Sequence, residues 1–275
     1  MKKNRRQRNT INFSLAVGIA LVSAVLLFVF VGLFYTPYDP MEMSMTLKNK
    51  APSLSHPFGT DYLGRDILSR VMDGAGTTFL IGAATVLIGL VAGTLIGAFT
   101  GYYGGLADEI LMRLNDTLTS FPSILLALVF VSVIGTGKYN IIIALGIIFI
   151  PSFARVVRGE FIVQKELDYV RNAKLLGAGN LRIMFVHILP NTAPILISAV
   201  TIGLNNAILA ESGMSYLSLG VQPPDPSLGR MLSEAQGYLM SAPWAAVAPG
   251  MMIVLTVLGF SMISENIGRG EMRGK

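Results

Sequence analysis

Six apolar segments set this sequence apart from that of an ordinary soluble domain. They lie at roughly 11–34, 77–100, 121–135, 141–157, 192–209 and 244–263. A helix needs about 20 apolar residues to cross the hydrocarbon core of a bilayer. Charged residues make up only 13% of the chain, against about 25% in soluble domains. The sequence therefore predicts an all-α membrane protein with about six transmembrane helices. The lipid bilayer is accordingly one of its expected partners.

The first and third segments depart from a simple span. Five basic residues precede the first segment, which is longer than the roughly 7–15 residues of a signal-peptide core and ends without a small-residue cleavage site. We therefore expect an uncleaved first helix. The third segment is short, and we expect the amphipathic stretch 108–120 to extend it at its N-terminal end, with Pro122 near the join.

The placement of Lys and Arg predicts the orientation in the membrane. With the N-terminus inside, the inner segments hold fifteen of these residues and the outer segments hold six. Basic residues accumulate in cytoplasmic loops, so both termini are predicted to be cytoplasmic. The resulting divisions are a basic N-terminus 1–10, a first helix 11–34, an extracytoplasmic loop 35–76, a transmembrane core 77–268 with a cytoplasmic loop 158–190 and an extracytoplasmic loop 210–243, and a cytoplasmic tail 269–275.

Several kinds of chemistry are disfavoured. The chain has no cysteine, which excludes disulfides and thiolate metal sites. The net charge is +5, and the basic residues cluster at the ends of the apolar runs. This placement is typical of residues that orient a protein in the membrane, and it does not indicate a nucleic-acid-binding surface. The two histidines, His56 and His187, are predicted on opposite sides of the membrane, so no metal site is expected. No HExxH or GxSxG motif is present, and no catalytic residue is predicted.

The chain also lacks a recognisable ATP site. The stretch Gly135–Thr136–Gly137–Lys138 invites comparison with a phosphate loop, but Ser132 stands where its first glycine is needed. Tyr139 stands where a Ser or Thr would bind magnesium. Energy must come from another subunit or from an ion gradient. Use of an ion gradient would make the chain an ion-coupled secondary transporter. Such transporters often contain inverted repeats, and none is visible here.

The segment 168–191 has the pattern of a short helix, a glycine and a second helix. A helix from 168 to 176 would end at Gly177, because glycine readily takes the left-handed position after a helix. A second helical stretch, 181–189, leads to Pro190. This unit could offer a compact knob to a soluble partner, or it could lie on the membrane surface and touch only headgroups.

At this point the sequence resembles a known family. The segment is similar to the cytoplasmic loop of permease subunits of ABC importers, whose pattern is Glu-Ala-Ala, a glycine four residues later and a final Leu-Pro. Ala173, Gly177, Leu189 and Pro190 match that pattern, whereas Arg171 replaces its glutamate. Asn172 replaces its first alanine. Because Arg171 stands in place of the glutamate, no salt bridge of that glutamate is carried over.

Further motifs resemble the dipeptide, oligopeptide and nickel branch of that family, in particular its second, C-type permease. The similarity runs from about residue 10 to residue 268, and the C-terminal family pattern Gly-Asp-Gly-Leu-Arg-Asp is replaced by Ser-Glu-Asn-Ile-Gly-Arg at 264–269. The matching stretches are 56–61, 63–66, 69–70, 101–105, 108, 112–113, 121–122, 217–224, 231–235, 242–244 and 249–250.

The resemblance implies a type I importer permease in a bacterial cytoplasmic membrane. It implies a second homologous permease, two cytoplasmic ATPases that bind ATP and Mg, and an extracytoplasmic binding protein, with no cofactor in this chain. The cargo would be di- or oligopeptides, or alternatively nickel or a metal chelate. The residues expected to couple to an ATPase are Asp168, Tyr169, Arg171, Ala173, Lys174, Gly177, Ala178, Leu189 and Pro190.

Two asparagines lie inside the fifth apolar segment. Asn205 and Asn206 are placed at membrane depth, where polar groups usually face a bundle interior or a water-filled path. They are predicted either to line a pore or to form an interhelical hydrogen bond. Glu211, at the outer end of the segment, could simply sit at the interface with water.

Overall fold

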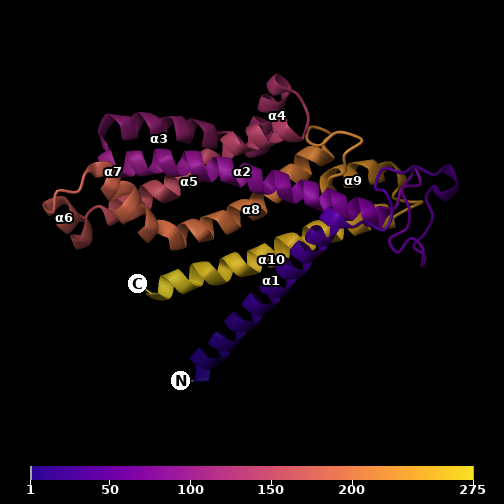
Figure 1. The fold of residues 1–275 in the computed structure, drawn as a ribbon, viewed down its shortest axis with the longest axis horizontal. Coiled ribbons are helices and arrows are strands. Elements are labelled where there is room, and N and C mark those ends of the chain that lie inside the picture. Colours follow the sequence, from indigo (N-terminus) through magenta and orange to yellow (C-terminus); the bar gives the residue numbers. More distant parts are fainter. Residues whose placement is uncertain (1, 275) are drawn as a thin grey trace. The chain divides into compact units, whose positions relative to one another are not determined.

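The computed structural model describes the backbone of residues 2–274 and the side chains of residues 13–266. In this part of the chain the regular secondary structure is helical, with a single isolated bridge between Thr60 and Asp66 and no strand (Figure 1). The predicted all-α fold is confirmed. The longer helices are α1 (Lys2–Phe34), α2 (Ile67–Tyr103), α3 (Gly105–Ser120), α4 (Ser123–Ile134), α5 (Lys138–Gln164), α8 (Ala193–Tyr216) and α10 (Trp244–Gly274).

Shorter helical pieces fill the connections. The helices among them are α6 (Asp168–Leu175), α7 (Asn180–Arg182) and α9 (Leu228–Ala235). A π-helical segment, η2 (Ile183–Ile188), and the 3-10 turns η1 (Met45–Leu47), η3 (Leu189–Thr192) and η4 (Gln236–Tyr238) complete the series. The predicted terminal segments 1–10 and 269–275 lie outside the residues whose side chains are described.

Among the described residues, five helical stretches are long and apolar enough to cross a membrane, and the number is six if a bent helix pair forms one span. The bent pair is α3 and α4, whose axes differ by 96°. The stretch that was expected to extend the third span is therefore helical, but it turns sharply away from α4 instead of continuing it. Pro122 disfavours helical backbone at the preceding residue, and Phe121 is extended, with φ −88° and ψ 142°.

Helix α2 begins at Ile67, well before the expected start at residue 77. The reason lies in a local cap: Asp66 Oδ2 accepts a hydrogen bond from the backbone N–H of Ser69 at 2.8 Å. An aspartate that bonds the third residue of a helix stabilises the helix start. The segment 67–76, predicted as part of an extracytoplasmic loop, is thus the first part of a long helix.

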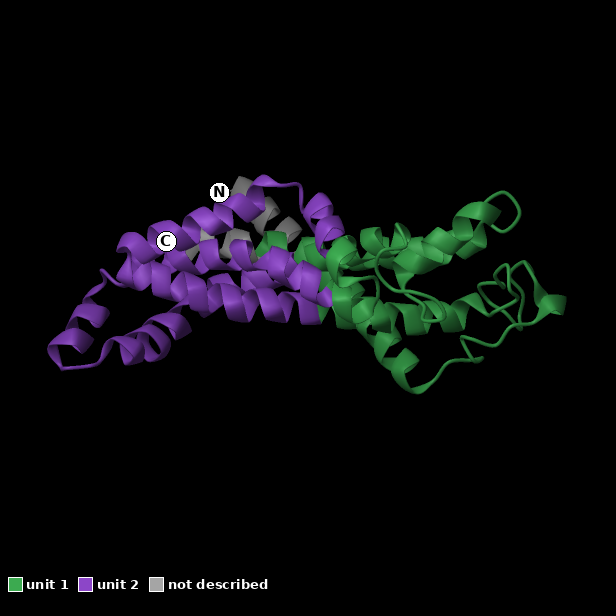
Figure 2. Ribbon diagram, turned by 90° about the horizontal axis from the view of Figure 1, so that it is seen from above, with its two compact units in different colours: residues 1–83, 131–141, 204–275 green, residues 84–130, 142–203 purple. Residues whose placement is uncertain are grey.

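The chain divides into two compact units, coloured separately in Figure 2. Unit 1 comprises residues 1–83, 131–141 and 204–275, and unit 2 comprises residues 84–130 and 142–203. In unit 1, α1 packs along α10 through small residues. A Cβ on Gly18 would meet Met262 Cβ at 2.8 Å, and one on Gly259 would meet Val22 at 2.8 Å. The core around this contact also takes side chains from α2 and α9.

Unit 2 contains a close contact between α2 and α5. Four glycines of α2, spaced four residues apart, face the α5 backbone; they are Gly89, Gly93, Gly97 and Gly101. Gly105, the fifth glycine of that spacing, lies outside α2 at the start of α3, with φ +67° and no neighbour within 4 Å. Small residues allow membrane helices to approach closely, so these four glycines set the separation of α2 and α5.

Candidate functional site

Helix α6 ends in a left-handed glycine, as the sequence predicts. Gly177 has φ +81°. Its N–H donates to the Lys174 carbonyl, and the Ala178 N–H donates to the Ala173 carbonyl, both at 3.0 Å. This pair of bonds is a Schellman motif, which satisfies carbonyl groups that the helix end would leave unpaired. The end of α6 is therefore fixed by its own backbone.

One face of α6 is anchored in the core of unit 2. Val170 and Ala173 are buried there. Val170 and Ala173 lie three residues apart, so both project from the same side of the helix. Tyr169 and Ala178 pack at the edge of the same cluster. The buried partners come from α2, α5 and the segment after α6, and they are Ala98, Tyr102, Val157, Phe161, Ile183, Met184 and Ile188.

Polar contacts join the ends of this segment to α2. Lys165, just before α6, donates from Nζ to the Gly101 carbonyl at 2.9 Å. Tyr102 Oη donates to Asn180 Oδ1 at 3.0 Å. The ammonium group of Lys174 lies 5.5 Å from the centre of the Tyr102 ring, within the range of a cation–π contact. α6 is thus held to the transmembrane part of unit 2 on both sides.

The end of α6 is open and carries two large apolar side chains, Leu175 in its last position and Leu176 directly after it. Leu175 is 85% exposed and Leu176 is 87% exposed. Arg171 lies 3.9 Å from Asp168 and 3.6 Å from Glu166. All three of these charged side chains are exposed, so the pairs contribute little to stability. The segment therefore presents leucines and charges on a short, rigid helix.

The chain returns to a long helix through an irregular stretch. The π-helical segment η2 buries Ile183, Met184 and Ile188, and the 3-10 turn η3 follows it. Leu189 packs beside the core of unit 2, whereas Pro190 is exposed. Proline has no N–H to donate and suits the first positions of a helical turn. This stretch runs into α8 and gives a continuous helical path from Asn180 to Tyr216.

The two asparagines of α8 have different surroundings. Asn205 Nδ2 donates to Ser261 Oγ of α10 at 3.3 Å. Its Oδ1 is buried and accepts no hydrogen bond from any described residue. The Asn206 side chain is exposed. The interhelical bond considered for this pair is therefore present at Asn205, and the pore-lining role stays a prediction.

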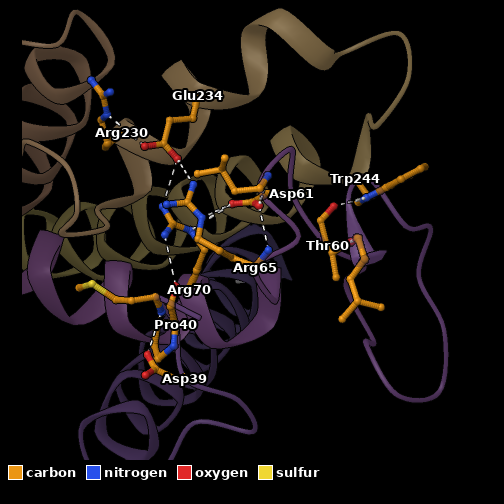
Figure 3. Close-up of polar contacts among 12 residues, drawn as sticks. Asp39, Pro40, Thr60, Asp61, Arg65, Arg70, Arg230, Glu234 and Trp244 are labelled. Carbon is orange, nitrogen blue, oxygen red and sulfur yellow. Dashed lines mark hydrogen bonds and ion pairs between the residues drawn. The ribbon is translucent and has the colours of Figure 1, made fainter. Parts of the chain in front are cut away.

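Unit 1 contains a buried charged network that no sequence argument assigned (Figure 3). Arg65 Nε lies 2.6 Å from Asp61 Oδ2, and Arg65 Nη2 lies 2.8 Å from Glu234 Oε2. Arg70 Nη2 reaches the same Glu234 oxygen at 3.1 Å. The side chains of Arg65 and Arg70 are only 4% and 1% exposed. Arg230 also contacts Glu234, at 3.3 Å through Oε1.

This network joins segments distant in sequence. Asp61 and Arg65 belong to the loop before α2, Arg70 to its first turn, and Glu234 to α9. Burial, followed by the nearby Glu234 carboxylate, raises the pKa of Tyr62 in the same loop. The loop 35–66 and α9 are therefore held together by charge as well as by packing.

The surroundings of Glu211 differ from one of the sequence expectations. Glu211 is fully buried, so the option that it simply sits at the water interface is wrong. Ser215 Oγ donates to Glu211 Oε1 at 2.7 Å, and Ser212 lies at 3.4 Å from Oε2. Ser215 stands four residues after Glu211, a spacing that places both on one helix face. That spacing is the signal that could have indicated a satisfied buried carboxyl group.

The comparison with known proteins gives consistent results. Residues 93–270 match the family described as binding-protein-dependent transport system inner membrane component. The chain is 39% identical over 235 residues to the glutathione transport system permease protein GsiD of Pectobacterium atrosepticum, covering 85% of this chain and 78% of that protein. It is 37% identical over 257 residues to the dipeptide transport system permease protein DppC of Haemophilus influenzae, covering 91% and 87%.

A solved structure shares the fold. It is a structure titled as inward facing conformations of the MetNI methionine ABC transporter, with a TM-score of 0.54 and 21% sequence identity. The match covers 74% of this chain and 95% of that chain. A family match over more than half of the chain and relatives similar over most of their length agree with the motifs. The chain therefore belongs to the family of inner membrane components of binding-protein-dependent transport systems, and it is a permease subunit of an ABC importer.

Proposed function

We propose that this permease imports di- and oligopeptides across a bacterial cytoplasmic membrane. The observation that carries the proposal is the similarity, at 37–39% identity over most of the chain, to permeases named for dipeptide and glutathione transport. Glutathione is itself a tripeptide, so both names describe short peptides. The chain would form half of a translocation pore, with a second homologous permease forming the other half.

The energy and the cargo would come from partner proteins. Two cytoplasmic ATPase subunits would bind ATP and Mg, and an extracytoplasmic binding protein would deliver the peptide. The distribution of fifteen basic residues against six supports an orientation with α6 on the cytoplasmic side. In that orientation the segment 165–190 would face the ATPases.

Helix α6 has the properties of a coupling element. Its buried face is fixed to α2 and α5, and its end is closed by the Gly177 turn. Its free end offers Leu175 and Leu176, which are too exposed to be explained by packing within the described chain. We infer that these leucines insert into a groove of an ATPase, so that closure of the ATPases moves α6 and, through it, the helices of unit 2.

The pore would use the polar residues of α8. Asn205 keeps a buried Oδ1 without a protein donor among the described residues, and Asn206 is exposed. Polar groups at membrane depth commonly mark a substrate path. The two asparagines would therefore offer hydrogen bonds to passing peptide groups, while selection among peptides would be made by the binding protein.

The test uses the complete importer, purified and reconstituted in vesicles. We expect ATP hydrolysis to rise several-fold when the binding protein and a dipeptide or glutathione are added together, with uptake of labelled peptide into the vesicles. Stimulation by a nickel chelate and not by any peptide would replace the proposed cargo with the metal alternative. Uptake by this chain alone, without nucleotide, would contradict the importer mechanism and favour a secondary transporter.

A further inference from the structure

Unit 1 contains an apolar groove that the proposed transport cycle does not use. Its volume is about 480 Å³, within the roughly 300–1,000 Å³ range of small-molecule sites. One wall is α1, with Ala24 and Phe28, and another is α10, with Met251. The loop before α2 closes the third side with Pro57 and Phe58. Every side chain that lines the groove is aliphatic, aromatic, thioether or proline.

The groove lies where the transmembrane helices meet the loops. Its walls belong to the candidate spans Phe13–Phe34 and Trp244–Asn266. Trp244, the first residue of α10, lines the groove, and its Nε1 donates to the Thr60 carbonyl at 3.2 Å. Tryptophan with its N–H turned to a polar partner is typical of the boundary between hydrocarbon and headgroups. The groove therefore opens at the depth where lipid chains begin.

An exposed lysine belongs to the loop that borders this opening. The Thr60 N–H donates to the Lys50 carbonyl at 3.0 Å, and the Lys50 N–H donates to Thr60 Oγ1 at 2.9 Å. The Thr60 carbonyl also accepts a hydrogen bond from Trp244, which lines the groove. The Lys50 backbone is therefore linked to the groove through Thr60. Lys50 is exposed and forms no ion pair with any described residue. The backbone of an exposed lysine without an ion-pair partner among the described residues is thus tied to the loop that borders the apolar groove.

We propose that the groove binds one acyl chain of an anionic glycerophospholipid, whose phosphate lies beside Lys50. Lipid tails are as apolar as the groove, so hydrophobicity alone would not select an occupant. Selectivity comes from the charge, since basic residues near the membrane surface attract anionic headgroups. A helix about 10–12 Å across would fill this volume with roughly one turn, whereas a single acyl chain fits along it. The bound lipid holds the loop at 52–58 against α1 and α10.

The test is photolabelling of the reconstituted importer with phosphatidylglycerol that carries a diazirine in its acyl chain. We expect labelled peptides from 52–58 and 244–255. Ala24 is exposed and lines the groove, so Ala24→Trp fills it without disturbing the core, and labelling should fall at least fivefold. Ala20 is also exposed on α1 but does not line the groove. Ala20→Trp should leave labelling unchanged.

The headgroup is tested by charge reversal. Lys50→Glu should reduce labelling by phosphatidylglycerol severalfold, and Lys48→Glu, at another exposed lysine of the same loop, should not. A phosphatidylcholine probe should label the groove weakly in all variants. Equal labelling of the groove in Ala24→Trp and the unaltered chain would overturn the proposal. So would crosslinks from position 24 to a partner's helix in place of lipid. Labelling is read without transport, so an inactive importer leaves the result interpretable.

Discussion

Gly93 on α2 and Ile150 on α5 lie so close that a Cβ on residue 93 would stand 2.8 Å from the Ile150 carbonyl oxygen. The same added atom would stand 2.6 Å from Phe153 Cβ. Real side chains do not approach at such distances, and backbone atoms cannot move aside cheaply. The backbones of α2 and α5 are therefore in contact because residue 93 has no side chain.

Gly93→Ala is expected to separate α2 from α5. Overpacking of a close contact costs roughly 1–3 kcal/mol, and the apparent thermal stability of the purified importer in detergent should fall accordingly. The matched control is Gly159→Ala on α5, where an added Cβ meets nothing within 4 Å. That variant should be neutral or slightly stabilising, because alanine favours helix over glycine by about 1 kcal/mol. Similar losses of thermal stability in both variants would show that the close contact of α2 and α5 at residue 93 does not determine the stability.

Glu234→Gln should destabilise unit 1 strongly. Removal of the carboxylate leaves Arg65 and Arg70 buried with Asp61 as their only described acidic partner. Breaking a buried ion pair costs about 3–5 kcal/mol, because a charge is left uncompensated. Chemical unfolding of the purified protein, followed by tryptophan fluorescence of Trp244, measures this loss.

The control for Glu234 is an exposed pair of the same chemistry. Glu109 lies 3.1 Å from Arg113, and their side chains are 61% and 80% exposed. Water screens such a pair, so Glu109→Gln should change the unfolding free energy far less than Glu234→Gln. Equal effects of the two substitutions would mean that the buried network contributes no more than surface charges do.

Sequence reasoning succeeded where the signals were local. The apolar runs predicted the long helices, and Gly177 predicted the end of α6, because a left-handed residue after a helix needs no distant partner. The start of α2 was missed because its first turns carry the charged residues Arg70 and Asp73, and the long apolar run begins only at residue 77. Arg70 finds its partner Glu234 at a separation of 164 residues, which no spacing rule reveals.

The bend between α3 and α4 shows a similar limit. Pro122 indicates a break in the helix, but the angle of 96° depends on which neighbours each half contacts. Two of those contacts are long-range ion pairs in unit 2, from Arg158 to Asp108 and from Arg155 to Asp116. Such pairs arise from the tertiary arrangement, so only the existence of the break was predictable.

Gly177→Ala should weaken the end of α6 through the backbone alone. No atom lies within 4 Å of an added Cβ, and the cost of the left-handed conformation is about 1–2 kcal/mol. Hydrogen exchange of the α6 amides should accelerate by roughly tenfold, and peptide uptake should fall. Gly179→Ala is the control, because Gly179 has φ −67° and equally open surroundings. Faster exchange in both variants alike would rule out the left-handed turn as the cause.

Replacement of Asn205 and Asn206 by leucine tests the pore. If their side chains serve the passing peptide, Asn206→Leu should lower the rate of peptide uptake severalfold while the importer remains assembled and its basal ATPase activity persists. Asn205→Leu should also destabilise the contact with Ser261 of α10, by about 1 kcal/mol. Normal uptake by the assembled double variant would remove the asparagines from the translocation path.

Leu175 and Leu176 are expected to transmit the force of ATP hydrolysis. Both side chains are almost wholly exposed, so Leu175→Asp with Leu176→Asp should leave the fold of the permease intact. The double variant should bind the ATPase subunits more weakly, by tenfold or more if both leucines enter a buried pocket. Peptide uptake should fall with binding, and Leu175→Met should retain both. Unchanged ATPase binding and uptake in the aspartate variant would mean that α6 couples through its charged residues, Asp168 and Arg171, and not through its apolar tip.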